Sequence, residues 1–278
     1  MLISALLMGS GMAAVAAGAE QNPDDVAFVA ACDGSTQRYV VIWPEAFAKD
    51  ETHDVLVALH GHGSDRWQFV KDPRDECRAA RDAAAKRHMI YVSPDYRAAT
   101  SWMGPKAESD VKQIIEDLKR HHRIGKVFLC GGSMGGTGAL TFAVLHPKLL
   151  DGVAAMNPAA NLVEYTGFPD AFRESYGGSK EQVPQEYRNR SAEFFPERLT
   201  MPVGITAGGK DDIVPAQSVV RLGNALKRLG RDIQIIYRED GGHATNYEDA
   251  TAILEFVIEK SNRSAPSNQS KLSGSNTK

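Results

Sequence analysis

"KVFLCGGSMGG" (126–136) runs from apolar residues into four glycines around one serine, Ser133. Glycine lacks a Cβ and permits backbone conformations that other residues avoid. The apolar run before the serine predicts a strand, and "GTGALTFAVLH" (136–146) after it predicts a helix. In that context a G-x-S-x-G pattern forms a nucleophile elbow, which holds the serine hydroxyl beside a helix N-terminus that favours negative charge. The stretch therefore predicts Ser133 as a nucleophile.

Short apolar runs alternate with helical patterns along most of the chain. The predicted strands are 38–43, 54–60, 89–94, 126–131, 151–157, 202–208 and 233–238. The predicted helices are 65–87, 106–122, 134–146, 215–229 and 244–260. Several strands are apolar on both faces, as strands buried in a parallel sheet are. The alternation predicts an α/β protein with a doubly wound, mostly parallel sheet and helices on both faces.

A serine nucleophile needs a base, and the base needs a group that orients it. On an elbow of this kind the acid and then the histidine follow the serine along the chain. "AGGKDDIVP" (207–215) and "EDGGHA" (239–244) follow the last two predicted strands, whose carboxyl ends lie at one edge of the sheet. His243 is the predicted base, because His146 is better placed to cap the helix after Ser133.

Three aspartates compete for the role of the acid. Asp211 stands four residues before Pro215 in a D-x-x-V-P arrangement that such loops often show. Asp212 is better suited to face solvent or cap the next helix. Asp240 lies three residues from His243, too near in sequence to reach around the imidazole easily. Asp211 is therefore the predicted acid.

The negative oxygen of a tetrahedral intermediate needs hydrogen-bond donors. One predicted donor is the backbone N–H of Met134, the residue after the nucleophile. The second is the backbone N–H of His62, since "LHGHGSD" (59–65) follows an earlier strand and glycines flank the histidine.

Residues 158–200 contain no convincing strand but many aromatic residues among glycines and prolines. A connection of that length in a compact domain is usually functional or has structure of its own. It is interpreted as a cap over one end of the sheet, and a peripheral helical insertion is the alternative. Trp102 and Tyr96 are candidates for binding substrate, with burial against the cap as the alternative for Trp102.

The composition limits the partners. The chain has 278 residues, 24% charged residues and a net charge of −3, so no bulk attraction to nucleic acid or anionic lipid is expected. Cys32, Cys77 and Cys130 do not form a disulfide framework, although Cys32 and Cys77 could pair in an oxidising compartment. The sequence does not indicate an oligomeric state.

Both ends of the chain differ in composition from the rest. Residues 1–19 are apolar and end in Ala17-Gly18-Ala19, which fits the small-x-small rule of a cleaved secretory signal. The apolar part is short and interrupted, so stable membrane insertion is not expected. The protein is therefore predicted to be secreted or periplasmic. Residues 261–278 are rich in Ser, Asn and Lys and are predicted to be disordered, which leaves 20–260 as the folded domain.

The motifs "HGHG", "GGSMGG", "GKDDIVP" and "GGH", in this order across about residues 35–260, resemble an α/β-hydrolase of the esterase type. "DGSTQRYVVIWPE" (33–45) and "YRAATSWMGPKAESDV" (96–111) resemble secreted feruloyl and acetyl-xylan esterases. Polyhydroxybutyrate-depolymerase-like and prolyl-oligopeptidase-like hydrolases share similar features. Many of these relatives carry an apolar or aromatic residue in place of His62.

The resemblance implies hydrolysis of carboxylic esters, on carbohydrate or on another small molecule, through an acyl-enzyme and without a metal or organic cofactor. Ser133 would attack, His243 would relay the proton and Asp211 would stabilise the imidazolium. Acyl transfer to a sugar and peptide hydrolysis by the same three residues stay open. A metallohydrolase using "HGHGSD" (60–65) is a weaker alternative, because the aspartate stands one residue too far along for the H-x-H-x-D pattern.

Overall fold

The computed structural model describes residues 22–263. The predicted signal peptide, 1–19, lies outside the described residues, as does the predicted tail from residue 264 onward. The strands are β1 Asp24–Val29, β2 Thr36–Ile42, β3 His53–Leu59, β4 Ile90–Pro94, β5 Ile124–Gly132, β6 Gly152–Met156, β7 Val203–Gly208 and β8 Ile233–Arg238. The helices are α1 Gln68–Lys71, α2 Asp75–Lys86, α3 Pro105–His121, α4 Met134–Leu145, α5 Pro169–Tyr176, α6 Pro184–Asn189, α7 Gln217–Arg228 and α8 Tyr247–Arg263. Short 3-10 helices span Pro147–Leu149, Ala192–Phe194 and Pro196–Arg198.

The strands form one eight-stranded sheet in the order β1-β2-β4-β3-β5-β6-β7-β8. β1 and β2 are antiparallel to their neighbours, and the other pairs are parallel. The predicted α/β class with a mostly parallel sheet is therefore confirmed. β1 was not among the predicted strands.

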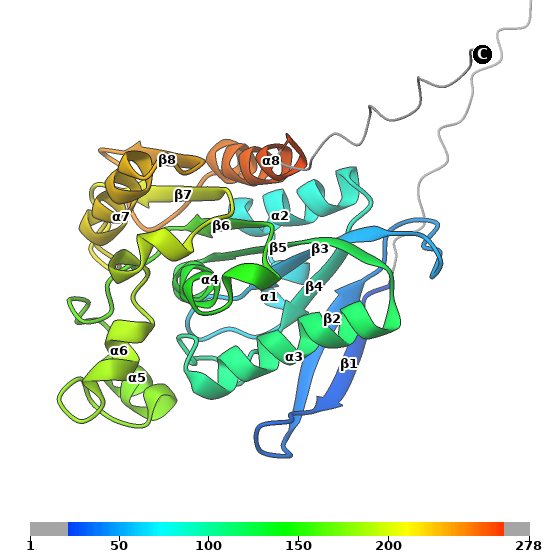
Figure 1. Ribbon diagram of the computed structural model, residues 1–278, viewed down its shortest axis with the longest axis horizontal. Helices are drawn as coiled ribbons and strands as arrows, with labels where there is room; N and C mark the ends of the chain where they lie inside the picture. The colour runs from blue at the N-terminus through cyan, green and yellow to red at the C-terminus, as the bar shows by residue number, and fades with distance from the viewer. Residues whose placement is uncertain (1–21, 264–278) are drawn as a thin grey trace, which may run out of the picture.

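Helices cover both faces of the sheet (Figure 1). One apolar cluster joins the sheet to α3, α4 and α7, and a second joins it to α2 and α8. Along β3 the side chains alternate between them: Val55 and Val57 pack in the first cluster, whereas Leu56 and Ala58 pack in the second. A strand buried on both faces must be apolar throughout, which is the pattern that its sequence shows.

Two predicted boundaries need correction. The helix predicted over 65–87 is two helices, α1 and α2, separated around Pro73. Proline lacks an N–H and restricts the residue before it, so it interrupts a helix at that point. The predicted tail begins too early, because α8 continues to Arg263 and buries Ser261.

The nucleophile elbow is as tight as its glycines indicate. Ser133 has φ 56° and ψ −116°, a conformation that non-glycine residues rarely adopt. A Cβ placed on Gly135 would lie 2.1 Å from the carbonyl oxygen of Leu59 in β3. A Cβ placed on Gly131 would lie 2.5 Å from the carbonyl carbon of Gly135. Helix α4 can therefore approach β3 and β5 this closely only if both positions are glycine.

Gly135→Ala is expected to destabilise the protein by about 3 kcal/mol or more, because its Cβ meets backbone that cannot move aside. Gly132→Ala is the matched control: its Cβ would be no closer than 3.7 Å to any neighbouring atom. That change should alter stability by less than about 1 kcal/mol. Urea unfolding of both variants measures the difference, and equal stabilities would contradict the steric explanation.

Residues 158–200 form the short helices α5 and α6 and two 3-10 turns. α5 and α6 lie to one side of the sheet in Figure 1, and α5 contacts α3. Their aromatic rings pack together, with the Tyr176 and Tyr187 centroids 4.9 Å apart. Phe168, at the start of α5, reaches the site described below. The buried aromatic residues of the segment therefore belong to the first apolar cluster, which also packs on the sheet, and Phe168 extends from the segment into the site.

The cysteines are not paired with one another. Cys32 is exposed, whereas Cys77 and Cys130 are buried. Burial raises the pKa of Cys77 to about 12 and also raises that of Cys130. The two buried thiols therefore act as small apolar side chains.

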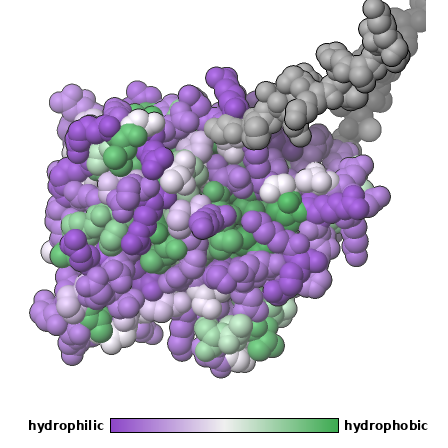
Figure 2. Space-filling view, viewed as in Figure 1, coloured by the Kyte–Doolittle hydropathy of each residue, from purple (hydrophilic) through white to green (hydrophobic). Residues whose placement is uncertain are grey.

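The face shown in Figure 2 is mostly hydrophilic, with apolar residues in a few separate groups. Within residues 22–263, every helix is too short or too polar to cross a membrane.

Candidate active site

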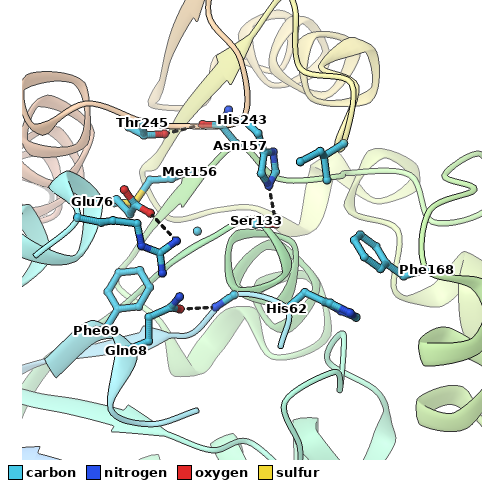
Figure 3. Close-up of a pocket in the computed structure, with 14 residues that line it drawn as sticks. His62, Gln68, Phe69, Glu76, Ser133, Met156, Asn157, Phe168, His243 and Thr245 are labelled. Atoms are coloured by element: carbon cyan, nitrogen blue, oxygen red, sulfur yellow. Dashed lines mark hydrogen bonds and ion pairs between the residues drawn. The ribbon is translucent and has the colours of Figure 1, made fainter. Parts of the chain in front are cut away.

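Three side chains from separate loops meet at the carboxyl edge of the sheet, and Figure 3 shows two of them, Ser133 and His243. His243 Nε2 lies 2.8 Å from Ser133 Oγ, and His243 Nδ1 lies 2.7 Å from Asp211 Oδ2. Ser133 follows β5, Asp211 follows β7 and His243 follows β8. With the imidazole proton on Nδ1, the histidine donates to the aspartate and accepts from the serine hydroxyl. That arrangement can deprotonate the serine as it attacks a carbonyl carbon.

Of the three candidate acids, all within the described range, Asp211 is the one that contacts His243. Its side chain is 1% exposed, and its Oδ1 accepts hydrogen bonds from the Ile213 and Val214 N–H groups. Asp240 is 85% exposed and pairs with Lys210, and Asp212 is exposed. The loop thus fixes one carboxylate oxygen and directs the other at the imidazole.

Asn157 belongs to the site but was not predicted. Its Nδ2 donates to the Gly242 carbonyl oxygen at 3.0 Å and to Asp211 Oδ2 at 3.3 Å. Its Oδ1 accepts hydrogen bonds from the hydroxyls of Thr206 and Thr245. It thereby connects the loops after β6, β7 and β8. Asn157 has a φ of 47°, which asparagine tolerates better than most residues do. The sequence alone does not indicate this backbone conformation.

Both predicted oxyanion donors lie at the site. Met134 is the first residue of α4, where N–H groups have no partner within the helix. His62 lines the same cavity as Ser133. The loop is held on both sides of His62: the Gly61 N–H donates to Gln68 Oε1 and the Gly63 N–H to the Ala99 carbonyl, each at 2.7 Å. Among the described residues, the His62 N–H has no partner, so it is available to a ligand.

The His62 side chain is fixed by aromatic neighbours. Its Nδ1 accepts a hydrogen bond from Trp102 Nε1–H at 3.0 Å, and its ring centroid lies 4.1 Å from that of Phe168. Burial lowers the pKa of His62, which favours the neutral ring that this bond requires. His62 thus links the loop after β3 to the segment 158–200.

Trp102 and Tyr96 do not lie where substrate-binding residues would. Trp102 is 0% exposed and Tyr96 is 1% exposed, and neither lines the cavity. Trp102 packs 4.7 Å from Phe172 of α5, and the Tyr96 hydroxyl donates to the His60 carbonyl oxygen. The alternative of burial against the segment 158–200 is correct for Trp102. Both aromatic residues support the loop that carries His62.

Trp102→Phe is expected to lower the kcat of a reaction catalysed by Ser133 about three- to tenfold, with little change in KM. The substitution removes the Nε1–H group that donates to His62 Nδ1 and fixes that side chain. Loss of a whole oxyanion donor costs about 10²- to 10³-fold, and loosening the loop should cost less. Phe172→Leu is the control, since it removes ring area from the same cluster but keeps the Trp102 N–H. Steady-state kinetics that show equal losses in kcat for both variants would contradict this role.

Ser133 opens into a cavity of about 230 Å³. Its lining residues are Gly61, His62, Gln68, Phe69, Arg74, Glu76, Gly132, Ser133, Met156, Asn157, Phe168, Ile213, His243 and Thr245. Figure 3 places Phe168 and Glu76 on opposite sides of Ser133. The cavity therefore has Phe168 on one side, and the charged Glu76 together with Phe69 on the other.

The "HGHGSD" stretch is not arranged as a metal site. The His60 Nδ1 and Nε2 atoms lie 2.8 and 3.1 Å from the carbonyl oxygens of Gly61 and Asp95, and His62 Nδ1 accepts from Trp102. In residues 22–263 no group of three or more His, Cys, Asp or Glu side chains is placed to hold a metal ion.

Residues 83–263, more than half of the chain, match the family model described as the prolyl oligopeptidase family. The chain belongs to the prolyl oligopeptidase family. It has the α/β-hydrolase fold, and the predicted resemblance to that superfamily is confirmed. A comparison with curated proteins gives no match.

Several solved structures share this fold. A putative dipeptidyl aminopeptidase IV from Bacteroides ovatus has a TM-score of 0.68 and 17% identity, covering 87% of this chain and 36% of that one. The acylaminoacyl peptidase of Pyrococcus horikoshii has a TM-score of 0.67 and 17% identity, with coverages of 87% and 42%. The chain thus spans less than half the length of both proteins. The fluorophosphonate-binding serine hydrolase F of Staphylococcus aureus has a TM-score of 0.64 and 18% identity, with coverages of 87% and 98%. At these identities the similarity concerns the fold.

Proposed function

We propose that this protein is a serine hydrolase that cleaves carboxylic esters through an acyl-enzyme. The alcohol part of the proposed substrate carries further hydroxyl groups, as in acyl esters of carbohydrates. The observation that carries the proposal is the chain of contacts from Asp211 through His243 to Ser133 Oγ, at 2.7 and 2.8 Å. The motif resemblance to secreted carbohydrate esterases supports an ester as the substrate. No metal or organic cofactor takes part in the proposed reaction.

The reaction proceeds in two steps. Ser133 Oγ attacks the ester carbonyl carbon while its proton passes to His243 Nε2, and the N–H groups of Met134 and His62 hold the oxyanion. His243 then gives the proton to the leaving alcohol oxygen, and the acyl group stays on Ser133. Water then gives a proton to His243 Nε2 and attacks the acyl carbon. His243 returns this proton to Ser133 Oγ as the bond between the acyl group and Oγ breaks, and the acid leaves. Asp211 orients the imidazole and stabilises its positive form throughout.

Peptide hydrolysis is the second candidate, and the family match and the titles of the similar structures favour it. A matched pair of substrates separates the two: a series of acetate esters against N-blocked dipeptide 4-nitroanilides. We expect turnover of the esters and rates on the anilides at least about 10³-fold lower. Comparable kcat/KM values on the anilides would replace the ester proposal with a peptidase.

Acyl transfer uses the same acyl-enzyme, because an acceptor alcohol can attack in place of water. We propose water as the acceptor, and product analysis with a competing free sugar tests this directly. We also propose export of the protein. Its test is N-terminal sequencing of protein recovered from the medium or periplasm, where a first residue near position 20 is expected.

A further inference from the structure

We propose that Glu76 is a specificity-determining residue that binds hydroxyl groups of the leaving alcohol. This inference rests on the proposed ester hydrolysis and adds to it the side on which the alcohol lies and the residue that recognises it. The argument depends on a second cavity, on the position of His243 and on the surroundings of the Glu76 carboxylate.

A second cavity, of about 510 Å³, adjoins the one that contains Ser133. The two cavities share the lining residues Arg74, Glu76, Asn157, His243 and Thr245. Beyond these, the second cavity continues along the loop after β8 to Asn246 and Asp249. It is more than twice as large as the first. Glu76 and His243 therefore stand where the two spaces join.

The position of His243 decides which part of an ester enters each space. His243 Nε2 must protonate the leaving oxygen, so the alcohol has to lie next to the imidazole. The second cavity begins at His243 and leads away from Ser133, whereas Phe168 and Ile213 line only the first. The acyl group is therefore expected to lie near Phe168 in the first cavity, and the alcohol is expected to extend past Glu76 into the larger second cavity.

The Glu76 carboxylate is close to the nucleophile and has unused hydrogen-bonding capacity. A Cβ placed on Gly132, the residue before Ser133, would lie 3.7 Å from Glu76 Cγ. The side chain is 16% exposed and makes one ion pair, 3.7 Å from Arg74 Nη1, with no hydrogen bond to any described residue. A carboxylate accepts up to four hydrogen bonds. Its oxygens are thus free to bind donors inside the cavity.

The neighbouring charged side chains form shorter ion pairs than Glu76 does. Arg74 binds Asp72 at 2.8 Å, and Asp75 lies 3.1 Å from Arg78. At the far end of the second cavity, Asp249 lies 2.6 Å from Arg238. Glu76 is therefore the carboxylate of this region with the most capacity for a ligand. The hydroxyl groups of a sugar or another polyol are donors of the right kind, and Arg74 can donate to their oxygens.

The experiment uses two acetate esters that share the acyl group and differ in the alcohol: an acetylated monosaccharide and cyclohexyl acetate. Glu76→Ala is expected to lower kcat/KM about tenfold for the sugar ester, through KM, and less than about twofold for cyclohexyl acetate. Glu76→Gln keeps one acceptor oxygen and should recover part of the loss. Glu248→Ala is the matched control, because Glu248 is also acidic, stands in the first turn of a helix and lines neither cavity.

The outcomes distinguish the inference from the proposed function. Equal losses on both esters, or an unchanged KM for the sugar ester, would overturn the role of Glu76 alone. Wild-type protein that cleaves cyclohexyl acetate but not the sugar ester would overturn both the role of Glu76 and the proposed preference for carbohydrate esters. The proposed function fails separately if the wild-type protein cleaves neither ester, or if Ser133→Ala still cleaves cyclohexyl acetate.

Discussion

Ser133→Ala lowers the kcat of ester hydrolysis by about 10⁴-fold or more, if the serine forms the acyl-enzyme as proposed. The substitution removes only the hydroxyl oxygen, and alanine has the same Cβ as serine. The strained φ of 56° is therefore not made worse, and the fold should be kept. Turnover of 4-nitrophenyl acetate measures the loss, and thermal unfolding provides the control for structure.

His243→Ala should cause a loss of similar size, and the double variant should be no slower than either single one. When two residues act together in one step, the losses from their substitutions do not multiply. A Ser133→Ala protein that keeps most of its rate, or losses that multiply in the double variant, would show that the two residues do not share a step.

Asp211→Asn is expected to reduce kcat by about 10⁴-fold, whereas Asp212→Asn should leave it within about twofold. The asparagine Oδ1 can still accept the Ile213 and Val214 N–H groups, so the loop keeps its shape. Its amide nitrogen, however, would donate to His243 Nδ1 and move the imidazole proton to Nε2. In that tautomer the histidine cannot accept the serine proton. Kinetics of the two variants measure this, and the reverse ranking would identify Asp212 as the acid.

The positions of Ser133, Asp211 and His243 could be predicted because each one directly follows a strand of a parallel sheet. The carboxyl ends of such strands share one edge, so a correct list of strands brings the three loops together without any knowledge of side-chain packing. The choice of Asp211 over Asp212 came from its spacing to Pro215, and it agrees with the contact to His243.

What could not be predicted depends on packing between distant segments. β1 carries two aspartates and is partly exposed at the sheet edge, so its sequence lacks the continuous apolar pattern of the inner strands. Trp102 and an exposed tryptophan look alike in sequence, since the residues that bury Trp102 come from α5. Glu76 looks like an ordinary acidic residue in the first turn of a helix, and its position beside Ser133 follows only from the arrangement of α2 against β5.

The contact of His62 with Trp102 and Phe168 has a consequence for engineering this enzyme. The ring that packs on Phe168 belongs to His62, whose backbone N–H is the proposed oxyanion donor, so a movement of the segment 158–200 is expected to move the loop after β3 as well. A chimera that receives this segment from another hydrolase should change turnover as well as substrate preference. Transplanting the loop together with the segment should restore the rate that exchange of the segment alone removes.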